Sequence, residues 1–512
     1  MQTFNQLKNR RAKKTLGQEL LVTSLLTAMG TAALVGIHHR YRKRHQRDVS
    51  VQDYVTGIRF QFHLLPSISK QQLTRFRYVL QQTTTVWQHT GHTASLADND
   101  SNNIINTTID PSTDHITTMW SRPVCWVSGV ASMPKNTALV KEEYLSNTND
   151  FGVVGIDADR QIVWQTTMPE RVHDIVVQPV VHNENEHGFD NSNSYKSSNQ
   201  SRDVVVMGRR PSENFWVLDT ATGQVKTTIS ASLYRHFYGH ACYSLDGSKL
   251  YVTENDTISL NGKIGVYNAY DNYKKIAEFD SHGIGPHELI MHPDGKTLVI
   301  ANGGIKTEQA SREELNLDTM CPSLVYLDPN DGSLLEQIMP EHNQMSVRHL
   351  DIHDDGTVMV GIQFQGERHL NVPLVLTHKR GEADFRPLVM PNDQWQRFHQ
   401  YIASVAVDSK RNRLCVTTPI GGCAAIFDLN TRALIDTVSL PDCAGAAVIT
   451  DKISNQHEKS GFMVSDGQGQ LTTLRVNNVS TASLNSSHDK ERVLVDSLLH
   501  RMSFDNHLQA LL

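Results

Sequence analysis

A repeated pair of short apolar strands joined by a polar turn constrains this fold more than any other feature. The pair occurs as GVVGIDADRQIVWQTTM, FWVLDTATGQVKTTI, IGVYNAYDNYKKIAEF, SLVYLDPNDGSLLEQI and AAIFDLNTRALIDTV. The last residues before these turns are Asp157, Asp219, Asn268, Asp328 and Asp428, at intervals of 62, 49, 60 and 100. Because the last interval spans two ordinary ones, the pattern predicts a further pair near residue 378. PLVLTHKRGEADFRPLVM lies there, with His378 at its turn.

A second pair of strands precedes several of these units and contains a tight glycine turn. HACYSLDGSKLYVTEN, HELIMHPDGKTLVIAN and HLDIHDDGTVMVGIQ show it, each with Asp-Gly between β-rich runs. Each period therefore holds four short antiparallel strands, which is typical of a β-propeller because radial stacking buries both faces of every sheet. Six units are clear, and AGAAVITD with GFMVSDGQGQLTTLRV supplies three strands of another. We predict an all-β, seven-bladed β-propeller, with six blades as the alternative, and we expect a segment near 120–132 to complete the ring with those three strands.

Helical extensions are expected at both ends of the propeller. We predict a signal-like or anchor-like segment with basic flanks at 1–47 and a helical, low-complexity polar linker at 48–118. The propeller is predicted at 119–478, followed by a polar linker and a C-terminal helix at 479–512. The helix is expected because Val493, Val495, Leu498, Leu499 and Met502 follow helix-like spacing.

An apolar run near the N-terminus lies between two groups of basic residues. The run extends from Leu20 to Ile37, with Lys and Arg concentrated at 8–14 and 40–47. It suits a signal peptide or a short membrane anchor, and a peripheral helix is the alternative. We therefore expect a protein that is exported, or associated with a membrane such as the inner membrane, through this segment. The net charge of −6 gives no general affinity for nucleic acid.

Histidines begin the inner strands of four consecutive predicted blades. They are His173 in RVHDIVV, His240 in YGHACYS, His287 in GPHELIM and His349 in VRHLDIH. The distance from histidine to the turn glycine is seven residues for His240 and His349 and eight for His287. We therefore expect these side chains to emerge at similar depth around one channel, as an arc, because the last two blades offer small residues instead.

Three interpretations of this arc are open. The four histidines are the candidate ligands of copper, iron or zinc, all of which accept neutral imidazole. A small, anionic ligand at the channel mouth is the second interpretation, in which protonated histidines act with arginines. Its candidate residues are Arg235, His236, His240, His282, His287, Arg348 and His349. In the third, the histidines only hydrogen-bond the backbone and fix loops.

Catalysis is the alternative to binding. Glu288, next to His287, and Glu254 are the candidate acid or base residues, because a Glu–His pair in one pocket can transfer protons. The sequence has no HExxH, GxSxG, P-loop or GxGxxG motif in a suitable context, so common hydrolase and nucleotide-binding sites are unsupported.

Several of these phrases resemble one family. RHFYGHACYSLDGSKLYVTEND, SHGIGPHELIMHPDGKTLVIANGGIKT, LNLDTMCPSLVYLD and SVRHLDI are similar to the bacterial domain of unknown function 1513 family, over roughly residues 129–470. The matching positions are Arg235, His236, Tyr238, His240, Glu254, Asn255, Asp256, His282, His287, Glu288, Asn302, Arg348 and His349. Arg10-Arg11 are followed by Ala12-Lys13-Lys14, a departure from the twin-arginine export signals common in the family.

The resemblance implies a propeller related to YVTN-repeat and lactonase-like proteins, exported to the periplasm and found beside iron-uptake components. No activity comes with it. We expect a propeller that binds a small ligand, a metal or a protein partner, such as a periplasmic iron-uptake component, at its histidine-lined mouth. The alternative is an enzyme, either a lactonase-like hydrolase or a metal-dependent oxidoreductase, using the region of His287 and Glu288.

Overall fold

The computed structural model describes residues 122–133, 151–180, 201–210, 212–307, 313–450, 460–477 and 492–511. All of them belong to one compact unit, Trp120–Leu512. The expected N-terminal segment at 1–47 and linker at 48–118 lie outside the described residues. In the described part of the chain, no helix is long and apolar enough to cross a membrane.

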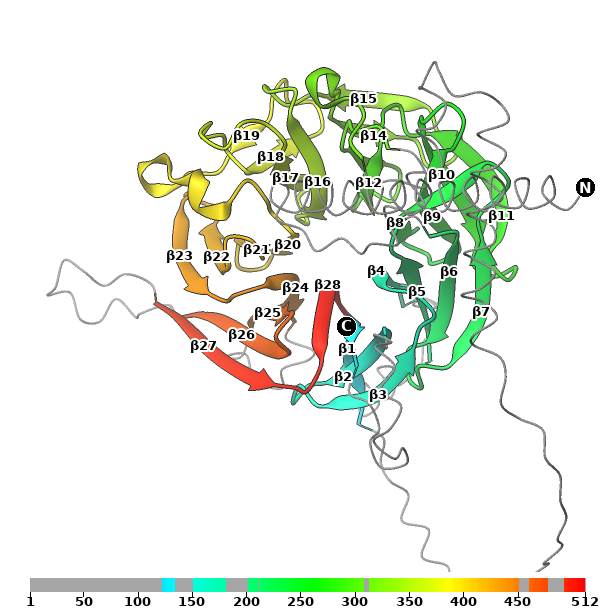
Figure 1. The fold of residues 1–512 in the computed structure, drawn as a ribbon, viewed down its shortest axis with the longest axis horizontal. Helices are drawn as coiled ribbons and strands as arrows, with labels where there is room; N and C mark the ends of the chain where they lie inside the picture. Colours follow the sequence, from blue (N-terminus) through cyan, green and yellow to red (C-terminus); the bar gives the residue numbers. More distant parts are fainter. Residues whose placement is uncertain are drawn as a thin grey trace, which may run out of the picture. The chain divides into compact units, whose positions relative to one another are not determined.

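Seven antiparallel sheets of four strands surround a common axis and form a seven-bladed β-propeller (Figure 1). Each innermost strand packs beside the innermost strands of the two neighbouring blades, so the ring is closed. The innermost strands are β4 (Val172–Val177), β8 (Arg235–Tyr243), β12 (Pro286–Met291), β16 (Met345–Ile352), β20 (Ser404–Asp408), β24 (Cys443–Ile449) and β28 (Ser503–Ala510).

Three further strands complete each blade outward from the axis. The second strands are β5 (Asp203–Gly208), β9 (Lys249–Asp256), β13 (Leu298–Asn302), β17 (Thr357–Phe364), β21 (Arg413–Thr418), β25 (Gly461–Asp466) and β1 (Val124–Ser132). The third strands are β6 (Asn214–Asp219), β10 (Gly262–Asn268), β14 (Ser323–Leu327), β18 (Val375–Lys379), β22 (Cys423–Asp428), β26 (Gln470–Asn477) and β2 (Gly152–Asp157). The outer strands are β7 (Val225–Ser230), β11 (Lys274–Asp280), β15 (Leu334–Ile338), β19 (Arg386–Pro387), β23 (Leu434–Ser439), β27 (Arg492–Leu499) and β3 (Ile162–Thr167). Three short 3-10 helices are also described: η3 (Leu317–Thr319), η4 (Pro391–Asp393) and η5 (Trp395–Phe398).

The recurring Asp or Asn of the sequence pattern closes the turn between the third and outer strands. Oδ1 of Asp219 accepts hydrogen bonds of 3.0 Å from the N–H groups of Ala221 and Thr222. Oδ1 of Asp328 accepts one of 2.8 Å from Asn330 in the same position of another blade. Such side-chain turns form within a few residues, which is why the marker is readable in the sequence. The unit expected near residue 378 is present as β18 and β19.

The core lies between neighbouring blades. Phe215 of β6 packs against Phe237 of β8 and Tyr267 of β10, with ring centroids 5.2 and 5.5 Å apart, and all three side chains are buried. Burying a side chain of this size contributes roughly 1.5–3 kcal/mol. Because each blade covers the face of the next one, the ring fixes the direction in which every inner strand points.

The ring is closed by the C-terminal strand. β28 pairs antiparallel with β1, which pairs with β2, so one blade combines both ends of the described chain. The segment near 120–132 therefore completes the ring, but in a blade with β28, β2 and β3. The three strands β24, β25 and β26 take their fourth strand from β27.

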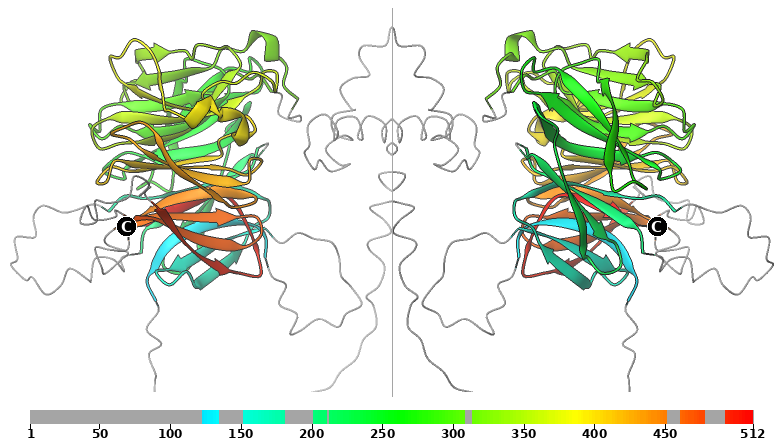
Figure 2. Two further views of the ribbon diagram at one scale, coloured as in Figure 1. Left: turned by 90° about the vertical axis from the view of Figure 1, so that its left-hand side faces the viewer. Right: turned by 90° about the vertical axis from the view of Figure 1, so that its right-hand side faces the viewer.

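The predicted C-terminal helix is wrong, and so is the propeller boundary at residue 478. Residues 492–499 and 503–510 are strands β27 and β28, and Figure 2 shows both (red) among the blades. Val493 is buried while Leu494, Val495 and Leu499 are exposed, so this outer strand is covered mainly at its start. A short apolar run fits either periodicity, and here the unfilled position in the sheet decides for strand.

Candidate metal centre at the propeller axis

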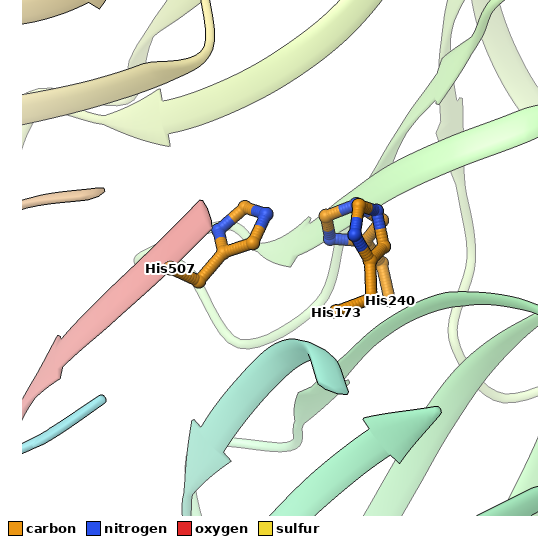
Figure 3. A group of neighbouring side chains, drawn as sticks. All are labelled: His173, His240 and His507. Atoms are coloured by element: carbon orange, nitrogen blue, oxygen red, sulfur yellow. The ribbon is translucent and has the colours of Figure 1, made fainter. Parts of the chain in front are cut away.

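Five histidine side chains meet where the inner strands face the axis. Four are the predicted ones, His173 of β4, His240 of β8, His287 of β12 and His349 of β16, and the fifth is His507 of β28. His240 contacts all the others: its ring centroid is 4.5 Å from that of His287 and 4.6 Å from that of His173. The centroids of His507 and His349 are 5.0 and 6.0 Å away. We call these five residues the histidine hub, and Figure 3 shows His173, His240 and His507 converging from separate strands.

The other four imidazole rings surround His240, and each of them lies next to two of the others. The centroids of His173 and His507 are 5.3 Å apart, and those of His507 and His349 are 5.6 Å apart. The corresponding distances are 4.9 Å between His349 and His287 and 5.8 Å between His287 and His173. Residues separated by more than 300 positions in the chain therefore share one small volume.

β-Bulges explain why the histidines point to the axis. In β4 the register with β5 shifts between Val172 and Ile175, which places His173 and Asp174 together in the bulge. The register shifts at the histidine in β8, β12, β16 and β28 as well. Of the two inner strands without a hub histidine, β20 pairs without a break, whereas β24 shifts between Cys443 and Gly445. A bulge bends its strand and re-aims side chains, so it lets a histidine and its acidic neighbour both reach the hub.

Gly239 permits the close approach of two of these strands. Its φ is 107°, a conformation that residues with a Cβ rarely adopt. A Cβ placed there would lie 2.5 Å from Cδ2 of His173. The glycine just before His240 therefore makes room for the ring that His240 contacts.

Two carboxylates orient the rings of the hub. Nδ1 of His240 lies 3.2 Å from Oδ2 of Asp174, and Nδ1 of His349 lies 3.0 Å from Oε2 of Glu288. A neutral imidazole that donates from Nδ1 to a carboxylate presents the lone pair of Nε2 on its other side. This carboxylate–histidine arrangement is the usual second shell of metal-binding histidines.

The same carboxylates also join neighbouring blades. Oε2 of Glu288 accepts a hydrogen bond of 3.1 Å from the N–H of Leu350, in the next blade. Oδ2 of Asp174 accepts one of 3.4 Å from Ala241. Burial opposes ionisation of Asp174, but His240 outweighs it and lowers the pKa of Asp174, whereas burial raises the pKa of Glu288. The acids are thus held in place by backbone as well as by imidazole.

Most hub histidines are neutral at neutral pH. Burial lowers the pKa values of His173, His287 and His349 well below the ordinary value, and it lowers that of His507 to about 4. For His240, burial also acts downward, but Asp174 outweighs it and raises the pKa. Neutral imidazole is the form that binds metals, so four rings need to lose no proton before coordination.

Two groups of three histidines within the described residues are close enough together to hold a metal ion. In each group one ligand atom per residue lies within 4.8 Å of the others. The groups are His173 with His240 and His507, and His240 with His287 and His349. Both nitrogens of His240 are buried and have no hydrogen-bond partner among the described residues, and Nδ1 is the one that lies 3.2 Å from Asp174. An unpaired buried nitrogen is costly, and a metal ion would satisfy it.

Access to the hub is asymmetric. His240 and His349 are buried, whereas His173, His287 and His507 are half-buried. Arg348, a predicted ligand residue, lies beside the hub: after burial and the ring of His240, its charge also lowers the pKa of His349. Its Nε donates a hydrogen bond of 2.8 Å to Oγ of Ser346.

Two other predicted ligand residues are engaged away from the hub. Arg235 forms ion pairs of 2.7 Å with Glu278 and 3.2 Å with Asp256. His282 has a φ of 50°, and its Nε2 lies 3.2 Å from the carbonyl oxygen of Gly332. The structure does not bring either side chain to the five rings.

His236 and Glu254 are fully buried within the blade of β8 to β11. The ring of His236 lies 5.5 Å from that of Tyr238, and neither nitrogen has a partner among the described residues. Glu254, a predicted catalytic residue, accepts hydrogen bonds of 2.7 Å from the hydroxyl of Tyr267 and 2.6 Å from Nζ of Lys275. Its surroundings are those of an interior ion pair.

His507 is the hub residue that sequence reasoning missed. The prediction of a C-terminal helix removed it from consideration. The signal was the dipeptide His507-Leu508, which repeats His349-Leu350 at the corresponding place of an inner strand. In β28 the carbonyl of His507 accepts a hydrogen bond of 3.3 Å from Oγ of Ser128, which ties the residue into the closing blade.

Comparisons with known proteins give a family and no function. The family model described as "Protein of unknown function (DUF1513)" matches residues 192–511. No curated protein matches the sequence. The solved hydrazine synthase of Kuenenia stuttgartiensis aligns with a TM-score of 0.44 and 15% identity over 62% of this chain and 88% of that chain. Hsv2 of Kluyveromyces lactis aligns with a TM-score of 0.41 and 11% identity over 68% and 91%. Neither alignment bears on what this chain does.

Proposed function

The chain belongs to the DUF1513 family, whose function is unknown, and we propose that it binds one transition-metal ion at the histidine hub. The observation that carries the proposal is that His240 belongs to two groups of three imidazoles, while neither of its buried nitrogens has a hydrogen-bond partner among the described residues and Nδ1 lies 3.2 Å from Oδ2 of Asp174. Histidines that only fix loops would instead form hydrogen bonds with backbone groups, as Nε2 of His282 does with the carbonyl oxygen of Gly332.

The donor set favours zinc, copper or iron. Neutral imidazole suits all three, and no thiolate takes part, which disfavours a copper(I) thiolate or iron–sulfur site. Asp174 and Glu288 supply negative charge next to the rings, so that a divalent cation is compensated without a carboxylate ligand. The lowered pKa values of four rings disfavour the anionic-ligand interpretation, because neutral imidazole does not attract an anion.

The cellular role proposed here follows from the family resemblance. We propose an exported protein that holds its ion outside the cytoplasm, in the periplasm or at the inner membrane, and serves iron uptake with a protein partner. A direct test is the fractionation of cells that express the full chain, with determination of the mature N-terminus in the exported fraction.

Metal analysis tests the binding proposal. The full-length protein, purified without chelators, is expected to contain about one zinc, copper or iron ion per chain, and the metal-free protein should rebind one. The variant His240→Ala should lose this ion while retaining its β-sheet circular dichroism. His369→Ala is the matched control, because this ring is exposed and lies outside the hub. The proposal would be refuted if none of the three metals bound stoichiometrically. Unchanged metal binding in the His240→Ala protein would also refute it.

An enzyme that uses His287 and Glu288 is the second candidate. Burial raises the pKa of Glu288, as is common for general acids and bases. Three histidines and an open position form the usual site for a metal-activated water. The metal-loaded protein should then hydrolyse members of a lactone panel, and Glu288→Gln should abolish this activity. Activity that survives Glu288→Gln would exclude the assigned role.

A further inference from the structure

The two three-histidine groups of the hub are built alike and overlap in one residue. The first consists of His173, His240 and His507, and the second of His240, His287 and His349. They come from different blades except for β8, which supplies the shared ring. Each group therefore provides two histidines of its own in addition to His240.

Each group also has its own carboxylate. In the first group Asp174 lies 3.2 Å from Nδ1 of His240, and its other oxygen lies 3.8 Å from Nδ1 of His507. In the second group Glu288 lies 3.0 Å from Nδ1 of His349. Since such carboxylates fix the ring and raise its basicity, both groups have what a metal seat requires.

The shared histidine restricts how the two seats are used. Nδ1 of His240 faces Asp174, so only Nε2 is left for a metal, and one lone pair binds one ion. Two divalent ions in adjacent seats would also repel each other strongly in this buried location. The ring centroids of His240 and its four neighbours are all within 6.0 Å, so a short movement separates the seats.

We propose that the hub offers a single metal ion two alternative seats that share His240. The inference rests on the proposed metal binding and adds to it a defined exchange. The ion changes two of its three histidine ligands while remaining on Nε2 of His240, so it transfers between blades without returning to solvent. Each seat includes half-buried rings, His173 and His507 in the first and His287 in the second.

Glutamine substitutions separate the seats in the full-length protein. His507→Gln or His173→Gln removes the first seat, and His349→Gln or His287→Gln removes the second. Each variant should still bind one Cu²⁺ ion per chain, with an affinity within about tenfold of that of the unsubstituted protein. The change is small because the ion can occupy the remaining seat, and only the share of binding due to the lost seat disappears. His240→Gln, and the double variant His507→Gln/His349→Gln, should weaken binding on the order of a hundredfold or more, since ligands are lost from both seats.

Electron paramagnetic resonance of the Cu²⁺ protein supplies the independent readout. The spectrum of the unsubstituted protein should equal a weighted sum of the spectra of a first-seat variant and a second-seat variant. His369→Gln, on an exposed ring outside the hub, should leave both spectrum and affinity unchanged. A single spectral species with all five single substitutions equally damaging would show one site with common ligands and overturn the inference. Two Cu²⁺ ions per chain would also overturn it. No Cu²⁺, zinc or iron binding at all would refute the proposed function instead.

Discussion

One oxygen of Asp174 holds both the ring and the backbone of the blade that carries His240. Oδ2 lies 3.2 Å from Nδ1 of His240 and accepts a hydrogen bond of 3.4 Å from the N–H of the next residue, Ala241. Position and protonation of the central imidazole are therefore set from the neighbouring blade. This relationship allows the orienting role of a carboxylate to be tested apart from the ligands themselves.

Replacing Asp174 by Asn should weaken metal binding while the hub histidines remain. The amide keeps an acceptor for backbone but removes the charge that makes His240 a stronger ligand. We expect affinity for Zn²⁺ to fall about 10- to 100-fold, the usual effect of changing a second-shell carboxylate. Competition with a chromophoric chelator measures the change, and an unaltered affinity would contradict the assigned role of Asp174.

Asp351 is the matched control for this substitution. Its carboxylate accepts hydrogen bonds of 2.6 Å from the N–H of Val407 in the next blade and 2.8 Å from that of Ile352. Burial raises the pKa of Asp351 to about 7. Asp351→Asn should leave metal affinity unchanged, because this acid joins blades without orienting a hub histidine.

Glu254→Gln should lower stability without affecting metal binding. The carboxylate is fully buried and serves Tyr267 and Lys275, and Lys275 also contacts Glu278 at 2.8 Å. Breaking this interior pair should cost about 2 kcal/mol of unfolding free energy. Denaturant unfolding measures the loss, and a change in metal affinity or catalysis would instead return Glu254 to the list of functional residues.

The propeller was predictable because its repeating signal is local. The Asp219 side chain closes a turn within three residues, and the same device recurs at Asp328. Because each repeat supplies four short apolar strands, radial stacking of the repeats buries both faces of every sheet. The inward direction of four histidines was also predictable, because each lies in an inner strand and three of them, His240, His287 and His349, precede a turn glycine by seven or eight residues.

The closing blade was not predictable from local sequence, and the repeat of His349-Leu350 as His507-Leu508 was the one local sign of the fifth histidine. Val493 and Val495 suit either a strand or a helix, and what decides is pairing across the whole chain, such as Val127 with Gln509. The bulges were also hidden, since an extra residue is defined only against the partner strand. Four of the five candidate ligands could therefore be identified from the sequence. Which of them lie together depends on the pairing register of the inner strands.

Asp505→Asn should destabilise the closed ring. Asp505 of β28 is buried and forms two hydrogen bonds, of 2.6 and 2.9 Å, with the guanidinium of Arg171 just before β4. Asparagine removes the charge, but Arg171, whose side chain is 40% exposed, stays partly hydrated, so we expect a loss of about 2 kcal/mol. Asp280→Asn, which breaks a surface pair with Lys263, should cost less than about 1 kcal/mol. Equal effects of the two substitutions in urea unfolding would contradict a special role in ring closure.

His236 should make the protein less stable as the pH falls below about 6.5. Burial, followed by the charge of Arg210, lowers the pKa of this ring from 6.5 to about 4 in the folded state. Between these values the unfolded chain binds a proton that the folded chain excludes, so unfolding free energy decreases as pH decreases. The full difference is up to about 3 kcal/mol, reached near pH 4, because one pKa unit corresponds to about 1.4 kcal/mol.

The contribution of His236 is isolated by comparison with His236→Gln, which cannot take up the proton. The hub histidines titrate in both proteins, so their effect cancels in the difference between the two unfolding free energies. That difference should be constant above about pH 7 and should shift in favour of the Gln variant as pH falls from 6.5 to 4. A difference that stays constant over this range would mean that the folded protein protonates His236 as readily as the unfolded chain. The ring would then not be sealed between β8 and β9 in the way its burial indicates.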